Sequence, residues 1–303
     1  MRIAVVDMGS NSTRLLVVDV DSDSATMLDR RTTVTRLAEG VDRTGRLSDE
    51  AIGRVERALA EYRNVIEDLH AQTTIGVLTS ATRDAANGDE FVARVRDVYR
   101  IDARVIPGEE EARLTFRGAT YGREDIEHTA VVDIGGGSTE IVTGGGFRTS
   151  LQMGVVRFSE RHLHHDPPQP EELQGLTAAV RAVLAASLPA RPDVNALIAV
   201  AGTATTAAAI AHDIEPYDPD RVHRAHIALG DLEEILARLA ILPLAERREV
   251  RGLHPDRAPT IVAGIAILLE ATRAFGLDEL EISEHDLLLG AALDEVDRRA
   301  GTG

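Results

Sequence analysis

The 303-residue chain contains no cysteine and no lysine. Without cysteine, it has neither disulfide bonds nor a zinc site built on thiolates. Without lysine, it cannot carry the phosphate-binding P-loop whose lysine reaches the β- and γ-phosphates. Any phosphate-binding site must therefore rely on arginine, backbone amides, hydroxyl groups or a metal ion.

Aromatic residues are also scarce, at 3% of a chain that is 44% hydrophobic. The interior is therefore expected to consist mainly of alanine, valine, leucine and isoleucine. The longest apolar run, near residues 261–269, is too short to span a bilayer. Met1 and Arg2 lead directly into a segment that ends at Asp7, which does not fit a signal peptide. The sequence thus predicts a soluble, cytoplasmic protein that does not bind membranes.

Positive charge is in deficit, because 33 basic residues, all arginine, face 50 acidic ones and the formal net charge is −17. This balance argues against general binding to nucleic acid or to anionic membranes. A polyanionic substrate would need arginines and a metal ion gathered at one place. The length suits two domains of ordinary size.

The most informative stretch is AVVDIGGGSTEIVT, at residues 130–143. An apolar strand ends at Asp133, a turn of three glycines follows, and a second strand begins after it. A turn without side chains lets backbone N–H groups approach a phosphate closely. Asp133 and Glu140 are hard oxygen ligands of the kind that Mg²⁺ prefers, and we predict that they hold this ion.

The same pattern occurs near the N-terminus, where VVDMGSNST at residues 5–13 aligns without gaps on residues 131–139. Two copies at an offset of 126 residues favour a pair of phosphate-binding loops over two ordinary hairpins. Asp7 is the symmetric metal candidate, although an aspartate that caps its glycine turn is nearly as good an interpretation. Arg14 is a weaker candidate for phosphate. The predicted phosphate donors are Gly9, Ser10, Asn11, Ser12, Gly135, Gly136, Gly137 and Ser138.

The order of predicted elements gives the fold class. Three strands at about 2–6, 13–19 and 25–35, the last two joined by a polar hairpin turn, precede a helix at 48–71 that Ser48 caps. Strands and helices then alternate, which makes the first half an RNase H-like unit. Duplication of this unit predicts an α/β protein with the actin-like (ASKHA) two-domain fold and a cleft between the domains, where phosphates would bind. The expected domains are residues 1–124, joined by a terminal helix at about 285–300, and residues 125–284.

Several motifs in the same order resemble the exopolyphosphatase/guanosine pentaphosphate phosphohydrolase (Ppx/GppA) family. They include VVDMGSNSTRLLV, TSATRDA, GEEEARLTFRGA, VVDIGGGSTEIV and HPDRAPTIVAG. The resemblance implies Mg²⁺ dependence, release of terminal phosphate from polyphosphate or guanosine pentaphosphate, and a cytoplasmic enzyme that is commonly a homodimer. The chain looks like the short form that lacks an extra C-terminal helical domain. Its ending SEHDLLLG departs from the Arg-Glu-Gly of many members, so we assign no site role there.

The resemblance also implies roles for two residues. Glu111 matches the family's catalytic glutamate and would act as the general base that activates water. Its alternative role is that of a first-turn acid favoured by the helix dipole. Arg83 matches the active-site arginine and would bind phosphate oxygens, with a surface salt bridge as the alternative. The segment 202–206, GTATT, either approaches a nucleoside or caps a helix.

Two other functions remain open at this point. Actin-like sugar and acetate kinases share paired phosphate loops, so a phosphotransferase is the first alternative. A non-enzymatic nucleotide-binding or assembly protein is the second.

Overall fold

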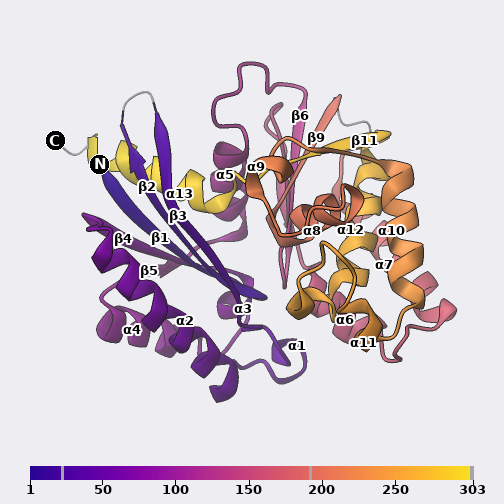
Figure 1. The fold of residues 1–303 in the computed structure, drawn as a ribbon, viewed down its shortest axis with the longest axis horizontal. Coiled ribbons are helices and arrows are strands. Elements are labelled where there is room, and N and C mark those ends of the chain that lie inside the picture. The colour runs from indigo at the N-terminus through magenta and orange to yellow at the C-terminus, as the bar shows by residue number, and fades with distance from the viewer. Residues whose placement is uncertain (22–23, 191–192, 301–303) are drawn as a thin grey trace. The chain divides into compact units, whose positions relative to one another are not determined.

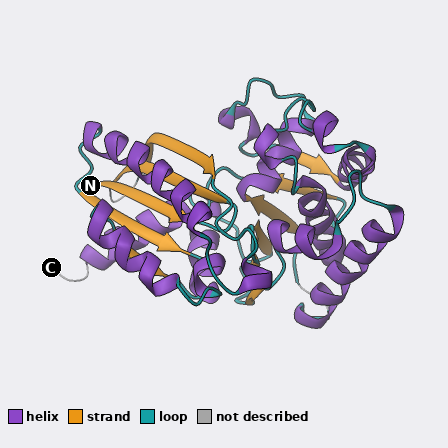
Figure 2. Cartoon of the chain, turned by 90° about the horizontal axis from the view of Figure 1, so that it is seen from below, coloured by secondary structure: helices purple, strands orange, loops and turns teal. Residues whose placement is uncertain are grey.

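The computed structural model describes residues 1–21, 24–190 and 193–300 of the chain. These residues form two compact units, Met1–Gly118 with Asp286–Gly303, and Ala119–His285 (Figures 1 and 2). We call them unit 1 and unit 2. The boundaries expected from the sequence lie after residues 124 and 284, whereas the units of the structure divide after Gly118 and His285.

Unit 1 is built on a five-stranded sheet of order β3-β2-β1-β4-β5. In this sheet β1 lies antiparallel to β2 and parallel to β4, and every residue of β1 after Arg2 is buried. A central strand covered on both faces reads as a continuous apolar run, which is why it was predictable. The turn between β2 and β3 closes through the Asp21 N–H and the Ser24 carbonyl at 3.0 Å, and its central residues 22 and 23 lie outside the described residues. The strands are β1 (Arg2–Met8), β2 (Ser12–Val20), β3 (Ala25–Val34), β4 (Thr73–Leu78) and β5 (Asp102–Val105).

The helices of unit 1 flank this sheet (Figure 1). As predicted, the Ser48 side chain caps α2 by accepting the Ala51 N–H at 3.2 Å. The last helix, α13, packs on β1 and β2. It also lies so close to α5 that a side chain on Gly118 or Gly290 would collide with the backbone of the other helix or its first turn. The helices are α1 (Val41–Thr44), α2 (Asp49–Asp68), α3 (Ser80–Arg83), α4 (Gly88–Tyr99), α5 (Gly108–Ala119) and α13 (Leu287–Ala300).

Unit 2 repeats the topology of unit 1. Its sheet order is β10-β11-β9-β6-β7-β8, of which β8-β7-β6-β9-β11 matches β3-β2-β1-β4-β5 with the same parallel and antiparallel pairs. The edge strand β10 is additional and was not predicted, because three residues are too few to show a strand pattern. The strands are β6 (Thr129–Ile134), β7 (Thr139–Thr143), β8 (Arg148–Leu151), β9 (Ala196–Val200), β10 (His226–Ala228) and β11 (Glu279–Ile282).

The core of unit 2 is a helix that is apolar on nearly all sides, α12, which packs against α6, α7, α8 and α10. A helix of this kind is stable only when it is surrounded. No helix in the described ranges is long and apolar enough to cross a membrane. The helices of unit 2 are α6 (Val155–His162), α7 (Pro170–Ser187), α8 (Ala201–Ala211), α9 (Pro219–Val222), α10 (Leu229–Ile241), α11 (Leu244–Arg247), the 3₁₀ turn η1 (Pro255–Arg257) and α12 (Ile261–Phe275).

The duplication confirms the predicted α/β class and the actin-like two-domain fold. It extends to single residues, since Asp7 faces Arg14 across β1 and β2, and Asp133 faces Glu140 across β6 and β7. The predicted cleft stays a prediction.

Candidate functional site

The glycine turn of unit 2 is held by its carbonyl oxygens. The three turn glycines accept hydrogen bonds of 2.8–3.0 Å from the first turn of α6, through the Val155 N–H, the Val156 N–H and the Arg157 Nε–H. In a trans peptide the carbonyl and the next N–H point in opposite directions. The N–H groups of residues 136–138 are therefore directed away from α6. Successive N–H groups on one side of a turn form a concave site for an anion.

Unit 1 has the same turn. The Gly9 N–H donates to the Ser12 carbonyl at 3.0 Å, and the Gly135 N–H donates to the Ser138 carbonyl at the same distance. The carbonyls of Ser10 and Asn11 accept from the segment 35–38, at 2.8–3.0 Å, so the N–H groups of Asn11 and Ser12 face the other way. Both predicted loops thus have the backbone geometry of an anion site.

The hydroxyl of Ser10 has a further role that the sequence did not indicate. It accepts the Ala81 N–H at 3.0 Å and so ties the first loop to α3, which ends at Arg83. Ser10 is nearly fully buried. Its side chain therefore positions the neighbouring arginine segment, whereas its role as a phosphate donor stays a prediction.

Asp133 and Glu140 are directly opposite each other on β6 and β7. Side chains at opposed positions lie on the same face of a sheet, with Cβ atoms about 4.5–5.5 Å apart. Both residues are buried, at 5% and 1% exposure, and Ser150 donates its hydroxyl to Glu140 Oε1 at 2.6 Å. Two buried carboxylates on one face disfavour each other unless a cation compensates them. This donor set fits Mg²⁺, which takes one or two carboxylates and keeps water or phosphate oxygens for its other positions.

Asp7 has a different environment, because Arg14 stands where unit 2 has Glu140. Arg14 donates to Asp7 Oδ2 through Nε at 2.8 Å, and its Nη2 forms an ion pair with the same oxygen at 2.7 Å. Burial raises the pKa of Asp7 above its ordinary value although Arg14 opposes this. Asp7 Oδ1 is buried and has no hydrogen-bond partner within the described residues. That orphaned oxygen suits a cation or an ordered water. Because Arg14 already pairs with the carboxylate, a metal at Asp7 is less favoured than one at Asp133, and the metal role of Asp7 stays a prediction.

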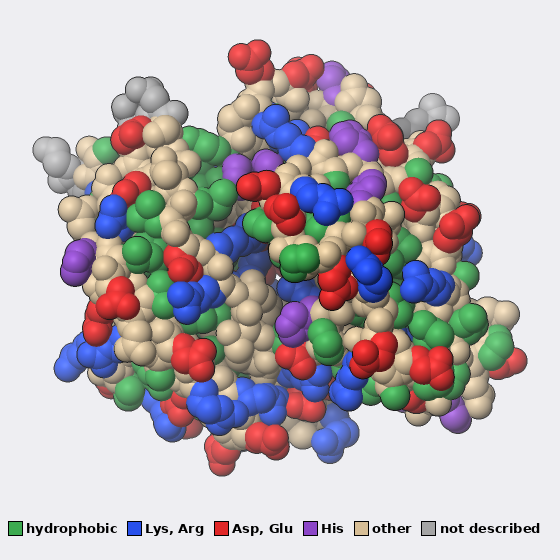
Figure 3. Space-filling model, in the orientation of Figure 1, with side chains coloured by type: hydrophobic (Ala, Val, Ile, Leu, Met, Phe, Trp, Pro, Cys, Tyr) green, Lys and Arg blue, Asp and Glu red, His purple; other side chains and the backbone are tan. Residues whose placement is uncertain are grey.

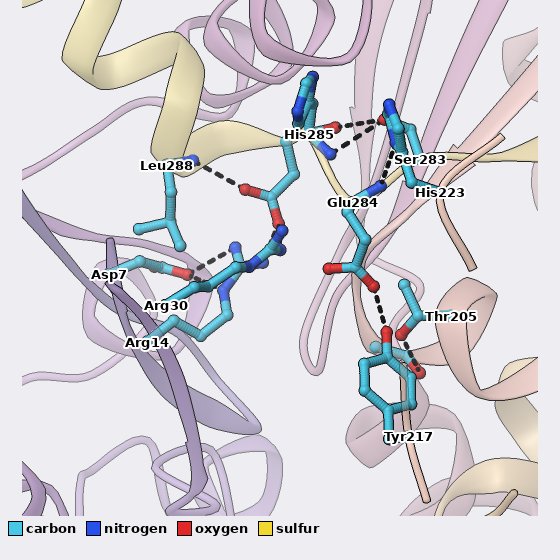
Figure 4. Close-up of polar contacts among 12 residues, drawn as sticks. Asp7, Arg14, Arg30, Thr205, Tyr217, His223, Ser283, Glu284, His285 and Leu288 are labelled. Carbon is cyan, nitrogen blue, oxygen red and sulfur yellow. Dashed lines mark hydrogen bonds and ion pairs between the residues drawn. The ribbon is translucent and has the colours of Figure 1, made fainter. Parts of the chain in front are cut away.

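Asp286 completes a buried cluster in unit 1 that the sequence did not indicate. Figure 4 labels its partners Arg14, Arg30 and Leu288. Asp286 accepts from Arg14 Nη1 at 2.5 Å and from Arg30 Nη2 at 2.9 Å, and its Oδ1 accepts the Leu288 N–H at the start of α13. Although burial alone would raise it, these guanidinium groups hold the pKa of Asp286 below its ordinary value. Arg14 is therefore engaged by two aspartates, which favours a structural role, and phosphate binding by Arg14 stays a prediction.

Replacement of Asp286 by asparagine is expected to destabilise unit 1 by about 3–5 kcal/mol, because the buried guanidinium of Arg14 and the partly buried one of Arg30 lose their shared counter-charge. Since the folded pKa of Asp286 lies below the ordinary value of 3.8, its contribution is present above about pH 4 and is lost as the pH falls through the folded pKa. Urea unfolding from pH 3 to pH 7 measures this. The exposed Asp97 in α4, changed to asparagine, is the control. Equal stability of Asp286→Asn and the wild type at neutral pH would contradict the cluster's role.

Glu111 and Arg83 lie together in unit 1. Arg83 Nη1 donates to Glu111 Oε2 at 2.8 Å and to the Ile106 carbonyl at 2.7 Å. Glu111 is 7% exposed, so it is more than a solvated first-turn acid. Its neighbour Glu110 pairs instead with Arg104, at 2.6 and 2.9 Å. The structure thus brings the predicted base and the predicted active-site arginine into contact, while their catalytic roles stay predictions.

The segment 202–206 forms the first turns of α8, but its glycine and threonines do not cap this helix. The N-cap position is Val200, and no side chain caps it. The cap interpretation of this motif is therefore wrong. Among the residues that the structure describes, no group of three or more histidine, aspartate or glutamate side chains is arranged to hold a metal. A metal at Asp133 and Glu140 would need oxygens from water or substrate.

Two duplicated sheets, each with a glycine turn that directs its N–H groups outward, define a phosphate-binding enzyme scaffold of the actin-like class. Residues 16–299 match the Ppx/GppA phosphatase family, and the chain belongs to this family.

Its relatives agree with this membership. The chain is 38% identical to exopolyphosphatase 2 of Mycobacterium tuberculosis over 96% of the chain and 98% of that protein. It is 30% identical to the guanosine-5′-triphosphate,3′-diphosphate pyrophosphatase of Vibrio atlanticus over 97% of the chain and 59% of that protein. The crystal structure of the Aquifex aeolicus family member matches with a TM-score of 0.82 and 30% identity, over 99% of this chain and 98% of that one. That of an exopolyphosphatase-like protein matches with a TM-score of 0.91 and 33% identity, over 98% and 99%.

Proposed function

We propose that the protein is a Mg²⁺-dependent phosphoanhydride hydrolase that releases the terminal phosphate of polyphosphate or of guanosine pentaphosphate. The observation that carries this proposal is the pair of outward-directed N–H turns, one of which lies beside the opposed carboxylates Asp133 and Glu140. The relatives named for exopolyphosphatase and for guanosine pentaphosphate hydrolysis support the substrate class.

The loops supply binding. In a chain without lysine, the N–H groups of residues 136–138 in unit 2 can meet several phosphate oxygens, and so can those of Asn11 and Ser12 in unit 1. Such fixed dipoles need little rearrangement as charge develops on the transferred group, so they also lower the barrier.

Glu111 supplies the base. Hydrolysis of a phosphoanhydride needs a water molecule held in line with the leaving group. A carboxylate that Arg83 holds in one orientation can accept the proton of this water as the new P–O bond forms. The leaving oxygen departs on the shortened polyphosphate or on guanosine tetraphosphate.

Asp133 and Glu140 would hold the magnesium ion, with Ser150 orienting Glu140. When bound, the ion neutralises charge on the phosphate oxygens.

The test is a phosphate-release assay on long-chain polyphosphate, tripolyphosphate and guanosine pentaphosphate, with and without Mg²⁺. We expect inorganic phosphate as the product, and only when Mg²⁺ is present. A parallel reaction with ADP or a sugar as acceptor separates hydrolysis from phosphotransfer. Phosphate transfer to the acceptor without phosphate release would support the kinase alternative instead.

Chain length and salt should influence the rate, because the net charge is −17. On the face that Figure 3 shows, acidic side chains lie scattered among the arginines. A long polyanion meets this repulsion, while the loops engage only its last few phosphates. We expect kcat/KM for tripolyphosphate or guanosine pentaphosphate to equal or exceed that for long chains at low salt. Moderate salt should narrow the difference, since the Debye length is about 10 Å at 0.1 M. A steep rise of kcat/KM with chain length at low salt would contradict this.

The cytoplasmic location and the homodimer that the family resemblance implies remain proposals. Sedimentation of the purified protein tests the second.

A further inference from the structure

Three parallel strands of unit 2 end at one edge of its sheet. β6 leads to the glycine turn, β9 leads to Gly202, and β11 leads to Glu284. In α/β sheets, ligands bind beyond the carboxyl ends of the strands. Strands lie about 4.8 Å apart, so β11 is roughly 10 Å from β6 along this edge. A ligand whose phosphates bind at the glycine turn can therefore extend toward Glu284.

The turn after β9 has unusual backbone geometry. Ala201 adopts a left-handed conformation with φ 65°, which is uncommon for a residue with a Cβ atom. Gly202 lies against the guanidinium of Arg257, the flexible end of a long side chain. Backbone strain such as that of Ala201 collects at ligand sites.

Beside this turn lies a cluster around Glu284 (Figure 4). The carboxylate of Glu284 accepts a hydrogen bond from the Tyr217 hydroxyl. The Glu284 N–H donates to His223 Nδ1 at 3.2 Å, and the His223 ring packs on His285 with centroids 4.4 Å apart. Glu284 is thus 7% exposed and fixed in place, while Tyr217 is 50% exposed.

We propose that Glu284 and Tyr217 form a binding site for the guanine base of guanosine pentaphosphate, a substrate assignment that rests on the proposed function. The N1–H and N2–H₂ of guanine are adjacent donors that match the two oxygens of a carboxylate. A carboxylate has about four acceptor positions, so Glu284 can keep its present partners, the Tyr217 hydroxyl among them, and accept from the base as well. The exposed ring of Tyr217 offers a face for stacking.

This chemistry selects one base and one substrate class. Adenine presents an acceptor at N1, which a carboxylate does not bind. Polyphosphate has no base, so it gains nothing from Glu284 or Tyr217. The cluster would therefore set the preference for guanosine pentaphosphate over inorganic polyphosphate, while the loops and carboxylates serve both.

The test compares kcat/KM for guanosine pentaphosphate with kcat/KM for tripolyphosphate in Glu284→Gln and Tyr217→Ala. We expect the ratio of the two to fall by about 10–100-fold in Glu284→Gln, the usual worth of hydrogen bonds to a charged group. Tyr217→Ala should lower the ratio, and Tyr217→Phe, which keeps the ring, should lower it less. The matched control is Glu234→Gln, an exposed glutamate of α10. A ratio equal to that of the wild type in both Glu284→Gln and Tyr217→Ala overturns the proposal.

A binding measurement, the binding arm of the test, makes the result independent of turnover. Calorimetry with guanosine tetraphosphate should show a dissociation constant raised by a similar factor in Glu284→Gln, with thermal unfolding as the check on folding. Wild-type protein that hydrolyses neither substrate contradicts the proposed function, and the binding arm then still decides the base site. Unchanged binding in Glu284→Gln overturns the site even where hydrolysis is observed.

Discussion

Replacement of Glu111 by glutamine is expected to lower kcat for phosphate release by about 10²–10⁴-fold, the usual contribution of a general base. Glutamine keeps the size of the side chain and an oxygen that can accept from Arg83, but it cannot take a proton from water. KM should change little, since the N–H turns that bind phosphate are untouched. Steady-state kinetics at saturating Mg²⁺ measures both constants.

The neighbouring glutamate provides the control for this result. Glu110 pairs with Arg104, whose hydrogen bond holds the pKa of Glu110 below its ordinary value. Glu110→Gln therefore loses an ion pair on the same helix turn without losing the proposed base, and kcat should stay near that of the wild type. If Glu111→Gln also turns over at the wild-type rate, Glu111 is not the base.

Replacement of Asp133 or Glu140 by alanine is expected to raise the Mg²⁺ concentration needed for half-maximal activity by more than the roughly 10–100-fold that removal of an outer partner costs. Each change removes one of two carboxylates on the same face of β6 and β7. Titration of activity with Mg²⁺ measures this, and calorimetry with Mg²⁺ gives the affinity without turnover.

Two further variants should change the Mg²⁺ requirement by less than Asp133→Ala and Glu140→Ala do. Ser150→Ala removes the hydroxyl that donates to Glu140 and should give a smaller increase. Glu124→Ala changes an exposed acid of the same unit and should give none. An unchanged Mg²⁺ requirement in both Asp133→Ala and Glu140→Ala would remove these residues from the metal site.

Much of the fold could be predicted because a short motif, at residues 5–13, recurs without gaps at residues 131–139 and so reveals the duplication. The offset of 126 residues that aligns the two turns is also the offset between the bonds that close them, from Gly9 to Ser12 and from Gly135 to Ser138. The strands on either side carry continuous apolar runs, so their positions in the centre of each sheet followed.

Element ends were harder to predict where local geometry interrupts a pattern. The motif HPDR, with proline directly before an apolar run, favours a helix that opens at His254. In the structure Pro255–Arg257 forms a 3₁₀ turn, and the helix α12 begins only at Ile261. Proline fixes φ and lacks the N–H donor, which suits such a turn.

Contacts between distant residues were not predictable from the pattern. Asp286 and Arg14 are separated by 272 residues, and nothing in the motif SEHDLLLG indicates that its aspartate neutralises two arginines. The duplication likewise showed that Arg14 and Glu140 occupy equivalent positions. It did not show that Arg14 forms an ion pair with Asp7, whereas Glu140 lies opposite the carboxylate of Asp133. The hydrogen bond between Glu284 and Tyr217 was likewise not predictable, because the two residues are 67 positions apart in the sequence.

In the proposed reaction a water molecule, activated by Glu111, cleaves the terminal phosphoanhydride. Hydrolysis of guanosine pentaphosphate or tripolyphosphate in ¹⁸O-enriched water tests it most directly, with mass spectrometry of both products. We expect one ¹⁸O atom per turnover in the released inorganic phosphate and none in the shortened product. Label in the shortened product instead, or phosphate transferred to an added acceptor without label, would contradict it.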